Sequence, residues 1–214
     1  MSQYAFSLSL PPVFSADNFY LSDSNRVAHR LVTAWPDWPA RTLLLHGPAG
    51  SGKSHLASIW AQQAHATLTH AKNGIPGADS IGGNWLLENI EQAKDAAALL
   101  HVLNYVRERD QWLLLTSAVP AAQLPLTLPD LTSRLKALPV AAITPPDDEV
   151  LAAALRKQFA DRQLKVEEEV IAYLLPRIER SFASVQEVVE TLDRKALSER
   201  KALTVPFVKQ TLNY

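Results

Sequence analysis

One stretch near the first quarter of the chain combines residue types and a spacing that bind phosphate, G-x4-G-K-[ST]. Its glycines let the backbone curl so that successive N–H groups face an anion, and the helix that follows adds partial positive charge. Lys53 is suited to pair with β- and γ-phosphate oxygens and Ser54 to hold Mg²⁺. The sequence therefore predicts a site for a nucleoside phosphate with Mg²⁺, with ADP or ATP among the candidates, whereas the alternative is a chance glycine-rich turn. The loop residues are Gly47, Pro48, Ala49, Gly50, Ser51, Gly52, Lys53 and Ser54.

A second candidate is Glu88, which ends the apolar run Trp85-Leu86-Leu87. An acid at the end of a buried strand is suited to hold the water shell of Mg²⁺, so we expect Glu88 to join Ser54 in a metal site. The alternative is an exposed acid at a strand end. The next residue is Asn89, which cannot accept a proton as a base.

The elements that must position these residues follow from the pattern of apolar residues. Helices are expected at 23–32, from 55 to about 63 and at 92–109, and short apolar strands at 41–46, 66–70, 85–88, 112–117 and 138–143. The stretch 118–129, rich in Pro and Leu, is expected to be a loop. Strands that alternate with helices predict an α/β fold, with a five-stranded parallel sheet covered by helices on both faces.

After Pro145-Pro146 the pattern changes to helices only, which predicts a small all-helical lid. We therefore expect an extended peptide at residues 1–13, an α/β base at 14–145 and a helical lid at 146–214. The first segment alternates apolar and polar residues before Pro11-Pro12. It is suited to dock in another protein's pocket, to add a strand to this protein's own sheet, or to remain a disordered tail.

The composition excludes several classes of protein. The chain has 21 Lys and Arg against 22 Asp and Glu, so a net charge of −1 and the absence of a basic stripe argue against direct DNA binding. Zero cysteines exclude disulfides and thiolate metal sites. No apolar run is long enough for a membrane span, and the start does not have the form of a signal peptide. We therefore expect a cytoplasmic protein without a membrane partner.

Three parts of the chain resemble the DnaA/Hda family of AAA+ proteins. The stretches 14–19 and 24–29 are similar to the entry of the AAA+ module of DnaA, and the likeness continues through the phosphate loop, Thr116-Ser117 and 131–135. The chain ends after the lid, without the DNA-binding domain of DnaA, and residues 200–209 are similar to the ending of Hda proteins. The start also resembles their sliding-clamp-binding peptide, with Phe6 where Leu is usual.

The resemblance implies roles for particular residues. It implies that Arg134 is an arginine finger that reaches a neighbour's nucleotide, although a surface arginine at a helix end is the alternative. It implies that Phe19 and Leu21, with Tyr20 between them, pass the adenine. It also implies that Gln3, Tyr4, Phe6 and Leu8 bind the DNA polymerase III sliding clamp, the β subunit. The implied partners are therefore DnaA and the clamp, with a homo-oligomer also possible.

Three positions depart from the pattern of DnaA, and all of them concern hydrolysis of the chain's own nucleotide. The second acid after the strand is Asn89, the sensor residue after Thr116-Ser117 is Ala118, and the lid arginine is replaced by Gln186, with Arg177 or Arg180 as possible substitutes. Each change removes charge that organises water or the γ-phosphate. We therefore expect a nucleotide-binding protein with weak or no ATPase of its own.

The resulting hypothesis is a regulator of bacterial replication initiation. It binds the clamp by its N-terminal peptide and promotes hydrolysis of DnaA-bound ATP with Arg134 in trans, which prevents re-initiation. Two alternatives stay open: an AAA+ ATPase of the helicase-loader type, and an adaptor that links clamp and DnaA without stimulating hydrolysis.

Overall fold

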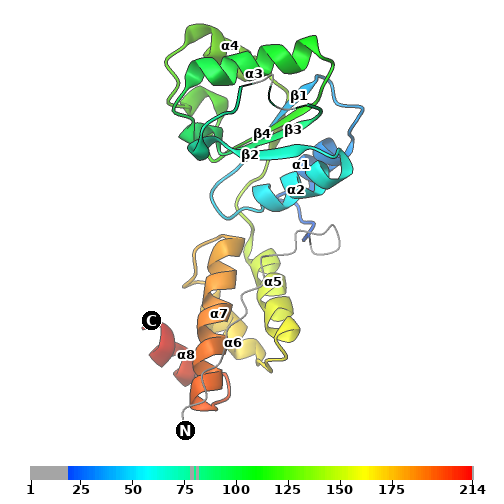
Figure 1. Cartoon of the computed structure of the whole chain (residues 1–214). Helices are drawn as coiled ribbons and strands as arrows, with labels where there is room; N and C mark the ends of the chain where they lie inside the picture. Colours follow the sequence, from blue (N-terminus) through cyan, green and yellow to red (C-terminus); the bar gives the residue numbers. More distant parts are fainter. Residues whose placement is uncertain (1–18, 78–79, 81, 214) are drawn as a thin grey trace.

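The computed structural model of the chain describes residues 19–77, 80 and 82–213. The clamp-binding residues expected at the start, Gln3, Tyr4, Phe6 and Leu8, lie outside the described residues. The described chain forms an α/β base and a smaller helical lid, which stand one above the other in Figure 1. The predicted combination of a parallel five-stranded sheet and a helical C-terminal region is confirmed.

The sheet is parallel throughout, with the strand order β2-β3-β4-β1-β5. Strand β1, which lies between β4 and β5, leads directly into the phosphate loop, and the carboxyl ends of the parallel strands β1, β3 and β4 lie at the same edge of the sheet. The strands are β1 (Thr42–His46), β2 (Thr67–His70), β3 (Trp85–Glu88), β4 (Leu113–Ser117) and β5 (Val140–Ala142).

Helices cover both faces of the sheet, as Figure 1 shows. Helices α1 (Arg26–Thr33) and α2 (Lys53–Gln63) pack on one face, and α3 (Ala96–Glu108) and α4 (Pro129–Ala137) on the other. Successive residues of a strand point to opposite faces. Leu43 and Leu45 of β1 therefore pack with α1 and α2, whereas Leu44 packs on the α3 side. The inner strands β1, β3 and β4 are buried on both faces and contain continuous apolar runs, whereas the edge strand β2 is more polar and partly exposed.

Helix α4 was not expected from the sequence, which assigned no element to residues 130–137. It begins with Pro129 in its first turn, where a missing N–H costs nothing, and buries Leu131 and Leu135. Helix α3 begins at Ala96, later than expected, because the short 3₁₀ turn η4 (Ile90–Gln92) precedes it and the Asp95 side chain caps it, accepting from Ala98 N at 2.9 Å. Two further 3₁₀ turns are η2 (Ala71–Asn73) and η5 (Ala121–Gln123).

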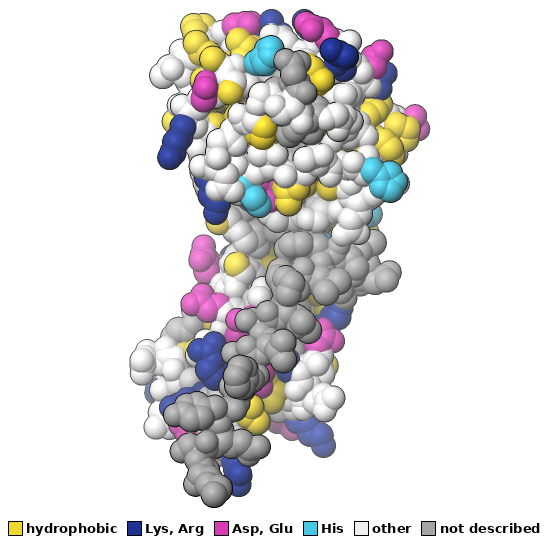
Figure 2. All heavy atoms as spheres, viewed as in Figure 1, with side chains coloured by type: hydrophobic (Ala, Val, Ile, Leu, Met, Phe, Trp, Pro, Cys, Tyr) yellow, Lys and Arg dark blue, Asp and Glu magenta, His cyan; other side chains and the backbone are white. Residues whose placement is uncertain are grey.

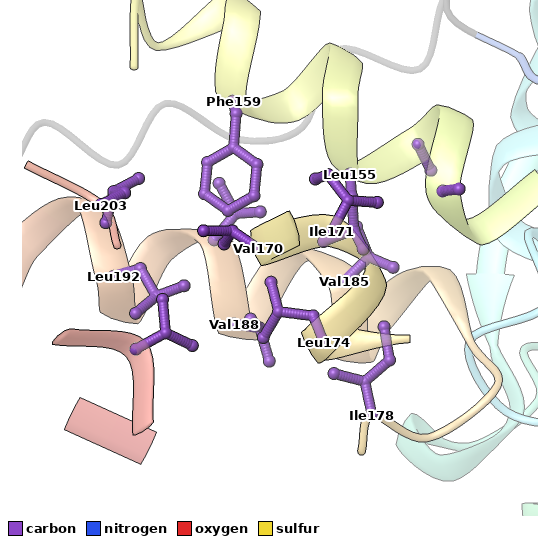
Figure 3. Packing of buried hydrophobic residues seen from close by; sticks show 14 of the residues in the cluster. Leu155, Phe159, Val170, Ile171, Leu174, Ile178, Val185, Val188, Leu192 and Leu203 are labelled. Atoms are coloured by element: carbon purple, nitrogen blue, oxygen red, sulfur yellow. The ribbon is translucent and has the colours of Figure 1, made fainter. Parts of the chain in front are cut away.

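The lid has a hydrophobic core of its own. Its helices are α5 (Asp148–Asp161), α6 (Glu168–Leu174), α7 (Phe182–Glu199) and α8 (Val205–Leu212). In Figure 3, Phe159 of α5, Ile171 of α6 and Leu192 of α7 point into a common interior. The four elements agree with the four lid helices expected from the sequence. Among the described residues, no helix combines the length and apolar character that a membrane crossing needs.

Candidate nucleotide-binding site

A cavity of about 630 Å³ lies between the base and the lid. The base contributes the phosphate loop and the carboxyl ends of β3 and β4, and the lid contributes one face of α5 and the start of α7. This volume is in the range of pockets that enclose a small ligand. The cavity is lined by Phe19, Tyr20, Ala49, Gly50, Gly52, Lys53, Ser54, His55, Asn89, Glu91, Gln92, Ala118, Ala154, Lys157, Gln158, Asp161, Phe182, Ala183 and Gln186.

The phosphate loop has the backbone geometry that its sequence predicts. Gly50 and Gly52 have positive φ angles of 68° and 95°, a conformation in which most side chains are strained. Gly52 is the residue immediately before α2, so the first turn of α2 faces the cavity through Lys53 and Ser54. Gly47, Pro48 and Ser51 form the part of the loop that does not line the cavity, and Ser51 is buried. The arrangement fits a phosphate group at a helix N-terminus.

Lys53 is the cation at this end of the cavity. Its side chain is 7% exposed, and Nζ donates to the carbonyl oxygens of Gly47 at 2.7 Å and Pro48 at 2.8 Å. Burial lowers the pKa of Lys53, and the carboxylates of Glu91 and Glu88 oppose that shift. The ammonium is therefore held inside the curve of the loop, which is where the terminal phosphates of a nucleotide need a positive charge.

Aromatic rings form another part of the cavity wall, and Phe19 lies close to the phosphate loop: a Cβ at Gly52 would be 3.8 Å from its ring. Phe19 stacks on His29 with ring centroids 5.5 Å apart, and its edge meets His55 at 5.3 Å. Tyr20 stacks on Phe182 of the lid at 6.4 Å. Flat rings of this kind can contact a base, so Phe19 and Tyr20 fit the expected adenine end. Leu21 does not: its side chain is 55% exposed and is not part of the cavity wall, because the chain turns toward α1 there.

The two expected metal ligands lie near Lys53. Ser54 lines the cavity, and Glu88 at the end of β3 is 4% exposed, so the alternative of an exposed strand-end acid is wrong. Glu88 Oε2 lies 3.2 Å from His70 Nδ1, and its buried Oε1 accepts no hydrogen bond from the described residues. In the described part of the chain, no three His, Asp or Glu side chains form a metal site by themselves. Mg²⁺ commonly uses few protein ligands together with phosphates and water, so these residues fit it.

The three positions that depart from the DnaA pattern come together in the cavity wall. Asn89, Ala118 and Gln186 all line it, from the ends of β3 and β4 and from α7. Gln186 donates to Glu190 at 2.8 Å. Neither possible substitute for the lid arginine lines the cavity: Arg177 stacks on Tyr173 and Arg180 pairs with Asp148 at 3.0 Å. No arginine therefore lines the described cavity.

Arg134 lies outside this cavity, in the last turn of α4. Its guanidinium bonds the Asp130 carboxylate at 3.0 and 3.2 Å and donates to Asn104 of α3, and the side chain is 35% exposed. It is thus a partly exposed arginine near a helix end, a position compatible with both interpretations made from the sequence.

Several wall residues were missed by the sequence analysis. Lys157 and Asp161 are four apart on α5, and Lys157 lies over the Tyr20 ring at 5.3 Å. Burial raises the pKa of Tyr20, and so does the charge of Asp161. The spacing of Lys157 and Asp161 places both residues on one face of a helix, but nothing in the sequence indicates what that face contacts. Glu91 and Phe182 were also missed, because their direction depends on the turns before η4 and α7.

Comparison with known proteins gives relatives for both parts of the chain. A family model for the lid domain of Hda matches residues 147–212. The chromosomal replication initiator protein DnaA of Symbiobacterium thermophilum is 25% identical over 204 residues, which cover 82% of this chain and 44% of that protein. The chain thus spans less than half the length of this relative.

Solved structures support the same fold. Domain III of the replication initiation protein DnaA from Thermotoga maritima has a TM-score of 0.79 at 18% identity, covering 95% of this chain and 97% of that one. AMPPCP-bound DnaA from Aquifex aeolicus has a TM-score of 0.70 at 18% identity, covering 90% and 71%. The fold of this chain, base and lid together, is therefore similar to that of the solved DnaA structures. Residues 147–212 thus match the lid domain of Hda, and the chain as a whole is similar to DnaA in sequence and in fold.

Proposed function

We propose that this chain is a regulator of bacterial replication initiation that acts on DnaA. The observation that carries the proposal is the position of Arg134: it lies outside the chain's own nucleotide cavity and is partly exposed on the base. A guanidinium at such a place does not reach the chain's own cavity but is accessible to a nucleotide held by a neighbouring molecule. The lid of the Hda type and the relationship to DnaA make DnaA the proposed neighbour.

In this mechanism Arg134 enters the site of ATP-bound DnaA and neutralises negative charge that develops on the transferred phosphoryl group. To do so it must exchange its contacts with Asp130 and Asn104 for the phosphate. The Asp130 pair is exposed and worth little, so this exchange costs little free energy. The expected product is DnaA with bound ADP, which no longer initiates.

The chain's own cavity holds ADP or ATP in this proposal, with Mg²⁺ at Ser54 and Glu88. AMPPCP bound to a protein of the same fold supports a nucleotide there. Because Asn89, Ala118 and Gln186 leave the γ-phosphate with few charged partners, the bound nucleotide sets the angle between base and lid and is hydrolysed slowly or not at all. ADP loses least from these three changes.

The N-terminal peptide adds the second half of the proposal. In this proposal Gln3, Tyr4, Phe6 and Leu8 of the cytoplasmic protein dock on the sliding clamp, which brings it to clamp-loaded DNA. Direct DNA contact is not needed. On the face of the base seen in Figure 2, Lys and Arg side chains are interspersed with Asp and Glu.

The test is ATP hydrolysis by DnaA on clamp-loaded DNA, with and without this protein. Arginine fingers contribute about 10³- to 10⁵-fold in rate, so Arg134→Ala should reduce the stimulated rate to the unstimulated level. Arg26→Ala is the matched control, because Arg26 is an exposed base arginine paired with Asp23 at 2.9 Å. It should leave the stimulation unchanged, and Gln3→Ala should remove only the clamp-dependent part.

Each other outcome points to an alternative. Full stimulation by the Arg134→Ala protein would falsify the finger. No stimulation by the unaltered protein, with clamp binding intact, indicates an adaptor. Steady turnover of ATP by this protein without DnaA indicates an ATPase of the helicase-loader type.

A further inference from the structure

Glu91 is a carboxylate that neither the phosphate loop nor the strand end explains. Strand β3 ends at Glu88, and Asn89 then adopts a left-handed conformation with φ of 58° and ψ of 55°. Its backbone N–H donates to Thr116 Oγ1 at 3.0 Å, which ties the turn to β4. The following turn η4 buries Ile90 and leaves Glu91 in the cavity wall. Because the backbone changes direction at Asn89, a second acid, Glu91, lies in the cavity wall three residues after Glu88.

The carboxylate of Glu91 acts on Lys53. Burial lowers the pKa of Lys53, and Glu91 is the largest opposing influence, ahead of Glu88. Glu91 and Lys53 also line the same cavity, together with Ser54. The Oε2 of Glu91 is shielded from solvent and accepts no hydrogen bond from the described residues.

Glu88 also has one carboxylate oxygen without a hydrogen bond, and a contact with His70 holds its side chain in one orientation. His70 and Glu88 are register partners on the neighbouring strands β2 and β3, and His70 Nδ1 lies 3.2 Å from Glu88 Oε2. Oε1 of Glu88 accepts no hydrogen bond from the described residues, although the residue is only 4% exposed. Two carboxylates, each with one shielded and unpaired oxygen, thus share the single ammonium of Lys53. Buried charges are normally paired or bound to a metal, so this end of the cavity needs a further cation.

We propose that Glu91 supplies the second carboxylate of the Mg²⁺ site, beside Ser54 and Glu88. Asn89 carries no charge, so the second carboxylate of this segment comes from Glu91, two residues later. Oxygen ligands and retained water suit Mg²⁺, and a second carboxylate balances its charge when only one ammonium is close. His70 positions Glu88 and contacts no metal. The inference rests on the proposed nucleotide site but not on the action of Arg134.

The test is calorimetric titration of the full chain with ADP, first in EDTA and then at increasing MgCl₂. The quantity compared is the Mg²⁺ concentration that gives half of the full change in ADP affinity. Glu91→Gln should raise it about 10-fold, the lower end of the losses seen when metal-site partners are removed. ADP affinity in EDTA should stay the same or increase, because a negative charge near the phosphates is gone.

The matched control is Asp161→Asn, which removes one negative charge from the lid side of the same cavity. It can change ADP affinity itself, but should leave the half-effect Mg²⁺ concentration within about twofold. Equal shifts in the two variants, or no shift in Glu91→Gln, overturn the proposal, as does a slower ATPase with unchanged Mg²⁺ dependence. If ADP fails to bind even in EDTA, the proposed nucleotide site is wrong. If ADP binds but Mg²⁺ has no effect, only the metal inference is wrong.

Discussion

The base and the lid differ in how their hydrophobic cores are built. In the base, one sheet separates two hydrophobic clusters, and residues 43–45 of β1 contribute to both of them. In the lid, four helices surround a single cluster that contains no residue of the base. The contacts across the boundary are fewer and local: Phe182 N donates to Gly50 O at 2.9 Å, and Tyr20 stacks on Phe182.

The boundary between base and lid is the part of the molecule that can respond to a ligand. Each region buries enough apolar surface to keep its own shape, whereas the cavity depends on aromatic and polar contacts at the boundary. The fit at Gly50 is tight, since a Cβ there would lie 2.8 Å from Ser181 Cβ. We therefore expect a nucleotide in the phosphate loop to change the docking of α7 and to move the lid as one body.

The largest expected effect comes from the lid core. Leu192 is fully buried in α7, so Leu192→Ala should destabilise the lid by about 2–5 kcal/mol through lost burial and a cavity. Hydrogen exchange should accelerate in α5–α8 and stay unchanged in β1 and β4. Leu197→Ala on the same helix is the control, because Leu197 is 67% exposed. Equal acceleration in the strands would mean that base and lid unfold as one unit.

A smaller effect is expected at the boundary. Phe182→Ala removes the ring that stacks on Tyr20 and lines the cavity, so ADP affinity should fall about 2- to 10-fold, the value of one aromatic contact. Calorimetry with ADP measures it. Phe207→Ala is the comparison, because Phe207 is buried in the lid core away from the cavity. If both variants lose affinity equally, lid stability controls binding and the boundary contacts do not.

The smallest effects are expected from the loss of helix caps, and they distinguish the base from the lid most directly. Asp95 caps α3 of the base, accepting from Ala98 N, and Asp147 caps α5 of the lid, accepting from Val150 N, each at 2.9 Å. Either Asp→Ala change should cost about 1 kcal/mol, and only in its own region. Residue-resolved hydrogen exchange in mild urea distinguishes them. A double variant that loses more than the sum of the single losses would show coupling between base and lid.

The local parts of this molecule follow from the sequence. The loop at 47–54, strand β3 and the four lid helices depend on near neighbours in the chain, through glycine spacing, apolar runs and helical periodicity. Strand β3 was predicted with its observed bounds, and so was the acid that ends it. The roles of Arg134 and of residues 1–13 came from a resemblance, and they remain proposals.

Tertiary structure decided what stands next to what. The pairing of His70 with Glu88 needs the strand order, since 17 residues separate them in the chain and only the register makes them neighbours. Helix α4 lacks a strong local pattern and is held by the packing of Leu131 and Leu135 on the sheet. Glu91 reaches the cavity only because Asn89 reverses the backbone. The periodicity of apolar residues indicates which face of a helix or strand is apolar. The element that packs against that face is determined by contacts between residues far apart in the chain.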